Sequence, residues 1–297
     1  IKGGFFMEST VTSISTEKKE KLDNIIKDLL KDKMVLAFSG GVDSTLILKL
    51  ASELRENKDD IVAMTFVTEF SPKDELDECV RLAKEMDVEL HIANVSIMDN
   101  EKLLNNVNYR CYHCKGGLFE NCFKLKDELG YGYVVDGTNL DDYQVFRPGI
   151  KALKDLGARS PLYEAGLSKA EVRAYSKELA IETHKKPSKP CMATRFPYNT
   201  RIDIDKFPMI EEGESYLESL GFDVNRVRVY GDNTRIEVEK DKLGQVFEHA
   251  DDIVKKFKDL GFKYVNIDLE GYRSGSMDEV VDDDLKTEVN PWLADEQ

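Results

Sequence analysis

The chain has 297 residues, of which 41% are hydrophobic and 33% charged, and its formal net charge is −15. Its apolar runs fall short of the roughly 20 residues that a membrane-spanning helix requires. A strongly acidic chain is also poorly suited to bind the phosphate backbone of a nucleic acid. We therefore expect a cytoplasmic protein of one large or two modest domains, with neither a membrane nor a nucleic acid as partner.

The first half of the chain alternates short apolar segments with amphipathic ones. Strands are predicted at 34–38, 61–67, 88–95 and 131–139, and helices at 17–31, 44–56, 72–87 and 115–130. This alternation is typical of an α/β fold in which helices connect the strands of a parallel sheet. Residues 1–6, ahead of Met7, lack the basic and apolar regions of a signal peptide, so we interpret them as an expression remnant.

The pattern changes after about residue 200. Alternating residues in 226–231 and 234–239 flank a short turn and predict a β-hairpin. Helices are predicted at 241–248 and 249–260 and a strand at 263–270, and the acidic tail from 278 is predicted to be mobile. The predicted fold is therefore a parallel-sheet α/β domain at 7–199, followed by a smaller α+β domain at 200–297.

The hexapeptide SGGVDS, which begins at Ser39, lies between the first predicted strand and its helix. Gly40 and Gly41 allow the backbone to approach a phosphate closely, and the amides at a helix N-terminus attract an anion. The hydroxyls of Ser39 and Ser44 can donate further bonds, and Asp43 could hold Mg²⁺. A tight turn capped by a serine is the structural alternative. The absence of a following Gly-Lys-Ser/Thr excludes a Walker A loop.

This hexapeptide resembles the fingerprint of the PP-loop ATP pyrophosphatases, which cleave ATP between its α and β phosphates and adenylate a carbonyl or carboxylate. The resemblance implies an adenine nucleotide alpha hydrolase-like fold, with ATP bound through the five loop residues named above. The stretch DGTNLDD at 136–142 is similar to the second nucleotide loop of that family, which implies ATP contacts at Gly137 and Thr138. Adenylation creates a good leaving group, so a nucleophile has to follow.

The five cysteines fall into two groups, and a disulfide framework is not expected in a chain of this kind. Cys79 and Cys122 lie on the apolar faces of predicted helices, where a cysteine behaves as a small hydrophobe. Cys111 and Cys114 lie in RCYHCK, and Cys191 lies in KPSKPCMATR. Nearby cations favour the thiolate, the form that binds metals or attacks an electrophile.

Two metal sites are compatible with the three polar cysteines. A structural zinc would need a fourth ligand from His113, His184 or Cys122. An iron–sulfur cluster would instead leave one iron without a protein ligand. That open iron could bind an additional sulfide, which would explain why a fourth ligand is missing.

Several segments from 34 to 279 together narrow the resemblance. They are RCYHCK (110–115), ARSPL (158–162), PSKPCMATR (187–195), RVRVYGDNTRIEVE (226–239) and GYRSGSMDE (271–279). In this order they resemble the LarE family, PP-loop sulfur transferases of nickel-pincer nucleotide biosynthesis. The family converts the two carboxylates of pyridinium-3,5-biscarboxylic acid mononucleotide to thiocarboxylates after adenylation by ATP.

The LarE family has two branches that obtain sulfur differently. One gives up the sulfur of a single cysteine, and the other uses three cysteines and is associated with a [4Fe-4S] cluster carrying a transferable sulfide. The resemblance to the second branch implies that Cys111, Cys114 and Cys191 hold the cluster, and that Cys191 and Asp43 have catalytic roles. It also implies a sulfide donor and a homo-oligomer.

An acidic nucleotide substrate predicts arginines at its site. Arg226 and Arg228 alternate along a predicted strand and project to the same face, where they could bind a phosphate. Arg195 follows Cys191 closely and could bind a carboxylate or phosphate, while Glu214 could orient the substrate or an arginine. Exposed salt bridges are the alternative for each of these four residues.

The predicted function is an ATP-dependent sulfur transferase that uses ATP, Mg²⁺ and a [4Fe-4S] cluster on a pyridinium nucleotide. One alternative is a PP-loop tRNA thiolase, which would need a basic RNA-binding surface that the charge of −15 disfavours. Another is an amidating ligase with a structural zinc. A non-catalytic nucleotide sensor is a third alternative, but it would leave Cys191 without a role.

Overall fold

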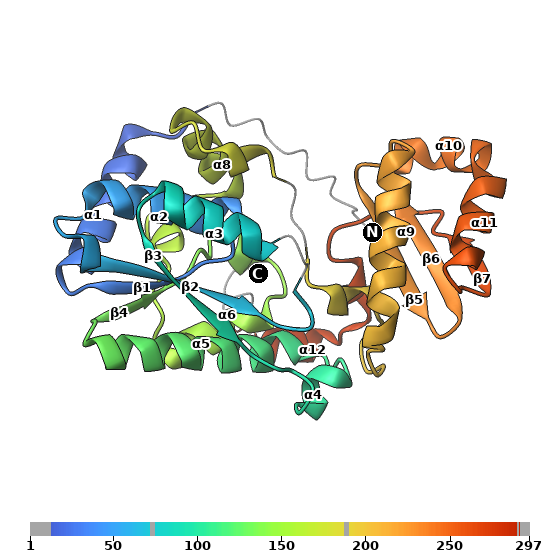
Figure 1. The fold of residues 1–297 in the computed structure, drawn as a ribbon, viewed down its shortest axis with the longest axis horizontal. Coiled ribbons are helices and arrows are strands. Elements are labelled where there is room, and N and C mark those ends of the chain that lie inside the picture. Colours follow the sequence, from blue (N-terminus) through green and yellow to red (C-terminus); the bar gives the residue numbers. More distant parts are fainter. Residues whose placement is uncertain (1–12, 72–74, 187–189, 290, 292–297) are drawn as a thin grey trace. The chain divides into compact units, whose positions relative to one another are not determined.

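The computed structural model describes residues 13–71, 75–186, 190–289 and 291 (Figure 1). The expression remnant predicted at 1–6 lies outside these ranges. Two compact units are present: the first comprises 1–96, 111–189 and 283–297, and the second comprises 97–110 and 190–282. The boundary predicted between 199 and 200 differs from this division, because residues 190–196 bond to elements of the second unit. The functional roles of the two predicted domains stay predictions.

The described part of the first unit contains a four-stranded sheet, as the α/β pattern predicts. Its strands are β1 (Met34–Ala37), β2 (Ile61–Val67), β3 (Glu89–Asn94) and β4 (Tyr133–Val135). Their order is β3-β2-β1-β4 and every pairing is parallel. Because β1 and β4 are parallel neighbours, the loops that follow them leave from the same edge of the sheet.

Helices cover both faces of this sheet (Figure 1). One face packs on α1 (Thr16–Lys31), α2 (Val42–Leu54), α3 (Glu75–Glu85), α7 (Pro161–Glu164) and α8 (Lys169–Glu178), and the other on α5 (Arg110–Leu129) and α6 (Pro148–Leu156). Along β1, Met34 and Leu36 point into the first core and Val35 into the second, and all three are fully buried. Burial on both faces is why this strand is a continuous apolar run in the sequence.

Two regions differ from the sequence prediction. Helix α5 begins at Arg110 instead of near 115, so Cys111 and Cys114 lie within its first five residues. The prediction that the tail is mobile from 278 is wrong for the residues up to Val289, most of which lie in helices. A 3-10 helix covers Ser276–Val280, α12 covers Asp283–Val289, and the side chain of Val289 is fully buried. A buried apolar residue at a helix end stabilises this acidic segment.

The second unit contains a smaller mixed sheet in its described residues. Strands β5 (Asn225–Tyr230) and β6 (Asn233–Val238) form the predicted hairpin, and β7 (Tyr264–Ile267) pairs in parallel with β6. Its helices are α4 (Glu101–Leu104), α9 (Phe207–Ser219), α10 (Leu243–Glu248) and α11 (Ala250–Asp259). In both units, the described helices are too short or too polar to cross a membrane.

Candidate functional site

The loop between β1 and α2 has the backbone that a phosphate site requires. Gly40 has a φ of +64°, and a Cβ there would lie 3.1 Å from the Cys79 sulfur, so only glycine fits without strain. Ser44 Oγ accepts a bond from the Ser39 amide and donates one to the Gly41 carbonyl, both at 3.3 Å. These bonds hold the turn at the N-terminus of a 13-residue helix, where backbone amides favour an anion.

The second predicted loop meets the first at the edge shared by β1 and β4. A Cβ at Gly137 would lie 3.0 Å from the backbone nitrogen of Ser44 and 3.1 Å from the Cβ of Asp43. Asn139 Nδ2 donates a 3.0 Å hydrogen bond to Asp43 Oδ1. Thr138 Oγ1 donates to Asp136 Oδ2 at 2.5 Å, at the end of β4. The structure thus brings together the residues predicted to bind ATP, although their contact with ATP stays a prediction.

Three lysines approach these two loops. Lys169 Nζ forms an ion pair with Asp43 Oδ2, Lys186 Nζ donates to the Gly40 carbonyl at 3.3 Å, and Lys115 Nζ lies 3.6 Å from Asp136 Oδ2. Sequence reasoning did not predict any of these three contacts, because the partners lie far away along the chain. It noted Lys115 and Lys186 only as cations near the cysteines, and it missed Lys169 altogether. It also missed Asn139, although that residue stands inside the quoted DGTNLDD motif and could have been found there.

The carboxylate of Asp43 is chemically suited to bind Mg²⁺. Carboxylate oxygens are the ligands that Mg²⁺ prefers, and a site next to bound phosphates is where proteins usually hold it. The side chain is about one-fifth exposed at the mouth of the loop. Asp43 could therefore hold Mg²⁺ beside a polyphosphate.

The cysteines differ in burial as the sequence suggests. Cys79 and Cys122 are buried at 1% and 0% exposure, which confirms their predicted core positions. Burial raises the pKa of both thiols, that of Cys122 to about 12. Cys111, Cys114 and Cys191 are half-buried. These three are therefore the better candidates for thiolate chemistry.

The three half-buried cysteines do not lie in one unit. Cys111 and Cys114 belong to the first unit and Cys191 to the second. Among the described residues, no three His, Cys, Asp or Glu side chains are grouped to hold a metal ion. Cys111 and Cys114 lie about 60° apart around α5, so both can serve one metal centre. This pair fits two ligands of a cluster or of a zinc ion, and the third ligand stays a prediction.

Cys122 and His184, two of the residues considered as a fourth zinc ligand, already have other contacts. The side chain of Cys122, a residue of α5, points into the core, with its sulfur 3.6 Å from that of Met64. The Nδ1 atom of His184 lies 2.8 Å from the Ile181 carbonyl oxygen, within hydrogen-bonding distance. The buried, neutral thiol of Cys122 is thus a poor metal ligand.

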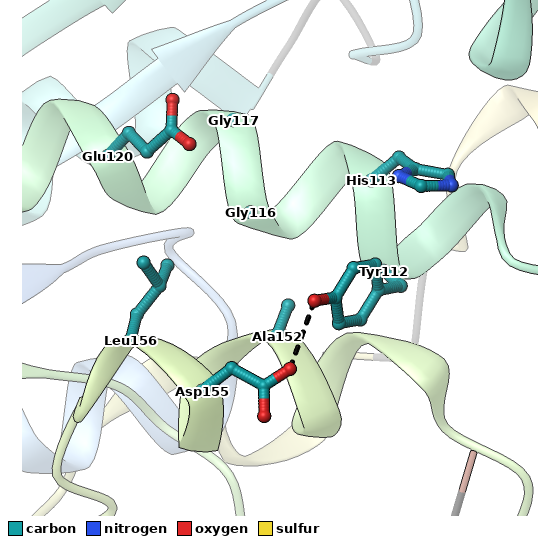
Figure 2. A pocket seen from close by; sticks show the side chains of 8 residues that line it. All are labelled: Tyr112, His113, Gly116, Gly117, Glu120, Ala152, Asp155 and Leu156. Carbon is teal, nitrogen blue, oxygen red and sulfur yellow. Dashed lines mark hydrogen bonds between the residues drawn. The ribbon is translucent and has the colours of Figure 1, made fainter. Parts of the chain in front are cut away.

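A small hollow lies between α5 and α6 (Figure 2). The spacing of its lining residues along α5 places Cys111 on the opposite face of that helix. The hollow has a volume of about 190 Å³, and Tyr112 Oη donates a 2.9 Å hydrogen bond to Asp155 Oδ2 at its border. Its lining comes from α5 and α6: Tyr112, His113, Gly116, Gly117, Glu120, Ala152, Asp155 and Leu156. None of the three cysteines of α5 lines it, so the hollow is not part of the predicted cysteine site.

In the second unit, two of the predicted arginines hold the loop that carries Cys191. Arg195 bonds both carboxylate oxygens of Glu214, at 2.9 and 2.7 Å, and donates to the Pro190 carbonyl at 2.9 Å. Arg228 donates to the Thr194 carbonyl at 2.6 Å. These bonds fix the backbone on both sides of Cys191, which directly precedes the 3-10 helix Met192–Arg195.

The same two arginines are buried in ion pairs. Arg228 bonds both oxygens of Glu237, at 3.1 and 2.9 Å, and Arg195 and Arg228 are 4% and 5% exposed. Glu214 also accepts a 3.0 Å bond from the Val227 amide, which ties α9 to β5. The alternative of exposed salt bridges is therefore wrong for these pairs. Direct contact of Arg195, Arg228 or Glu214 with substrate stays a prediction.

Arg226 has a different environment. Its guanidinium lies 5.2 Å from the centre of the Tyr272 ring and donates to the Asn225 carbonyl at 2.6 Å. Burial, and then the positive charge of Arg195, lower the pKa of Arg226. An anion beside this guanidinium would offset both effects. Arg226 is therefore the predicted arginine best suited to bind a phosphate or carboxylate.

Comparison with known proteins decides the family. A PP-loop domain family matches residues 14–144. An uncharacterised protein of Synechocystis sp. is 38% identical over 267 residues, covering 89% of this chain and 98% of that protein. The pyridinium-3,5-bisthiocarboxylic acid mononucleotide synthase of Lactiplantibacillus plantarum is 33% identical over 264 residues, covering 89% of this chain and 95% of the synthase.

The chain belongs to the LarE family. A further relative, an uncharacterised protein of Methanocaldococcus jannaschii, is 36% identical over 259 residues, covering 87% of this chain and 98% of that protein. Membership of the LarE family, together with the PP-loop domain, makes the chain an ATP-dependent enzyme of sulfur transfer. It also confirms the predicted α/β PP-loop fold.

Proposed function

We propose that the chain adenylates the carboxylates of pyridinium-3,5-biscarboxylic acid mononucleotide and converts them to thiocarboxylates. The observation that carries this proposal is the likeness, over 89% of the chain, to an enzyme named for the bisthiocarboxylic product. The joined loops at Asp43 and Gly137 support the ATP-dependent half of the reaction. The loop at Cys191, fixed by Arg195 and Arg228, supports the sulfur half.

In the proposed reaction, the loop from Ser39 to Ser44 binds the β and γ phosphates through its amides and hydroxyls. Asp43 would hold Mg²⁺, which supplies neutralisation of the phosphate charge. A substrate carboxylate oxygen attacks the α phosphorus, the bond to the β-phosphate oxygen breaks, and pyrophosphate leaves. A sulfur nucleophile then forms the C–S bond as the C–O bond to AMP breaks. The residues contribute mainly by positioning and by charge neutralisation.

We further propose that Cys111, Cys114 and Cys191 would hold a [4Fe-4S] cluster, whose open iron supplies a transferable sulfide. Three half-buried cysteines, two of them among the first five residues of α5, have the donor chemistry for it. Arg226 would bind the anionic nucleotide. The identity of the sulfide donor, the homo-oligomer and the cytoplasmic location stay predictions.

The test is iron and sulfide analysis of protein purified without oxygen, together with mass spectrometry of the product. We expect Cys111→Ala, Cys114→Ala and Cys191→Ala each to lose the brown absorbance and sulfur transfer while ATP binding persists. Cys79→Ala is the matched control and should keep the brown absorbance and sulfur transfer. Full activity without iron would overturn the cluster. Loss of about 34 Da from Cys191 after one turnover would show that the cysteine gives up its own sulfur.

A further inference from the structure

We infer that Lys169 binds the β and γ phosphates of ATP. Until Mg²⁺ binds to Asp43, the ammonium of Lys169 stays paired with that carboxylate. The inference deepens the proposed function, because it assigns a residue outside every predicted motif to the ATP site. It starts from a single contact: the ammonium of Lys169 is paired with Asp43 inside the phosphate loop.

Hydrogen bonds fix the backbone of Lys169, so the position of its Cα is well defined. Lys169 is the first residue of α8, and its amide donates to Asp141 Oδ2 at 3.0 Å. The preceding Ser168 caps the helix, accepting from the Glu171 amide at 3.3 Å and donating its own amide to Glu171 Oε2 at 2.9 Å. Asp141 belongs to the same loop as Gly137. The structure thus anchors the lysine to the second nucleotide loop and directs its ammonium to the first.

A metal ion on the carboxylate of Asp43 would compete with the present partners of that carboxylate. Its Oδ2 atom bonds the Lys169 ammonium and its Oδ1 atom bonds the amide of Asn139. A magnesium ion on this carboxylate would repel the neighbouring ammonium, so Lys169 would need another anion. The side chains of the pair are about one-third and one-fifth exposed. Ion pairs this exposed are weak, so exchanging partners costs little.

A polyphosphate in the loop is the anion within reach. It would lie against the amides at the start of α2, and Asp43 is in the first turn of that helix. When Mg²⁺ takes the carboxylate, the ammonium can turn its three donors to the phosphate oxygens without leaving the site. The lysine is then paired in both states, and Mg²⁺ and polyphosphate each favour the binding of the other.

The experiment measures dissociation constants for inorganic pyrophosphate, ATP and AMP, with and without Mg²⁺, by titration calorimetry. Lys169→Met should raise the constants for pyrophosphate and ATP roughly 10- to 100-fold, the range of a hydrogen bond between charged groups. AMP lacks the β and γ phosphates, so its constant should change less than about 2-fold. Lys177→Met is the matched control, since Lys177 is an exposed residue of the same helix.

A second background separates a phosphate ligand from a residue that only neutralises Asp43. In Asp43→Asn protein without Mg²⁺, Lys169→Met should still weaken pyrophosphate binding at least about tenfold. Lys169→Gln should do the same, and circular dichroism should show that all variants fold. If Lys169→Met has no effect in that background, the lysine only neutralises the aspartate and the inference is overturned. If wild-type protein binds neither ATP nor pyrophosphate, the proposed function is overturned with it.

Discussion

The phosphate loop of the first unit and the arginine network of the second use charge in different ways. In the loop, the charged pair Asp43–Lys169 is partly exposed, and the surrounding bonds come from backbone groups and hydroxyls. In the network, Arg228 and Glu237 are 5% and 1% exposed and bond each other through two contacts. One pair can exchange its partners at low cost, and the other cannot separate without leaving a buried charge.

This contrast indicates what each region is built to do. A partly exposed pair beside flexible hydroxyls suits a ligand that binds together with a metal and then leaves. Buried, doubly bonded pairs instead hold a backbone in place, and here they fix the loop of Cys191. Predicting function from an arginine in the sequence therefore requires knowing which of these two environments surrounds it.

The largest effect is expected at Asp43. Asp43→Ala should slow pyrophosphate release at least 10³-fold, about 4 kcal/mol of activation free energy, because the reaction loses its metal-binding carboxylate. A pyrophosphate-release assay with substrate present measures it. Glu53→Ala, which removes an acidic residue from the same helix, should leave the rate unchanged. Near-normal release by the Asp43 variant would place the metal on other residues.

Arg228→Ala should lower the free energy of unfolding by about 3 kcal/mol, because it leaves Glu237 buried with one cation fewer. The estimate is at the low end for such pairs, since Arg235 keeps its 2.8 Å contact with Glu237. Chemical denaturation measures the loss. The double variant Arg228→Leu/Glu237→Leu removes both charges and should recover most of the stability. A cost below 1 kcal/mol for the single variant would mean that the pair does not fix the loop.

Arg226→Ala should weaken binding of the pyridinium nucleotide by about 2 kcal/mol, the value of a bond to a charged group, and leave ATP affinity unchanged. Calorimetric titration with each ligand tests both statements. The control is Arg201→Ala, since Arg201 pairs with Glu101 on the surface of the same unit. Equal loss of both affinities would contradict a separate substrate site at Arg226.

The smallest effect concerns a buried group that carries no charge, Cys122. Burial raises its pKa to about 12, so the folded protein keeps the proton more tightly than the unfolded chain does. Below about pH 9 the thiol is protonated in both states, and its ionisation costs no stability. As the pH rises from about 9 towards 12, the unfolded chain loses this proton and the folded protein does not, so the free energy of unfolding falls. Cys122→Val should therefore remove about 1 kcal/mol of the loss in stability between pH 8 and pH 10. Denaturation of both proteins at the two pH values checks the sign.

Local sequence was enough to predict the sheet and the phosphate loop. Strand β2 has the predicted bounds, and the hairpin of β5 and β6 lies where alternating residues placed it. Helix α5 was predicted too short, because the polar RCYHCK segment does not carry the apolar periodicity of a helix. The acidic tail was misjudged for a related reason: composition does not reveal that Val289 packs into a core.

The sequence by itself determined the features that depend on neighbours along the chain. Gly40 and Gly41 between a strand and a helix specify the turn, and the polar surroundings of Cys111 set it apart from Cys122. Tertiary structure decided the pairs: Lys169 meets Asp43 across 126 positions, and Arg228 meets Thr194 across 34. A lysine or arginine has the same chemistry wherever it stands in a sequence. Only the folded chain decides whether its partner is a buried carboxylate, a backbone carbonyl or an arriving phosphate, because burial and distance set the strength of each bond.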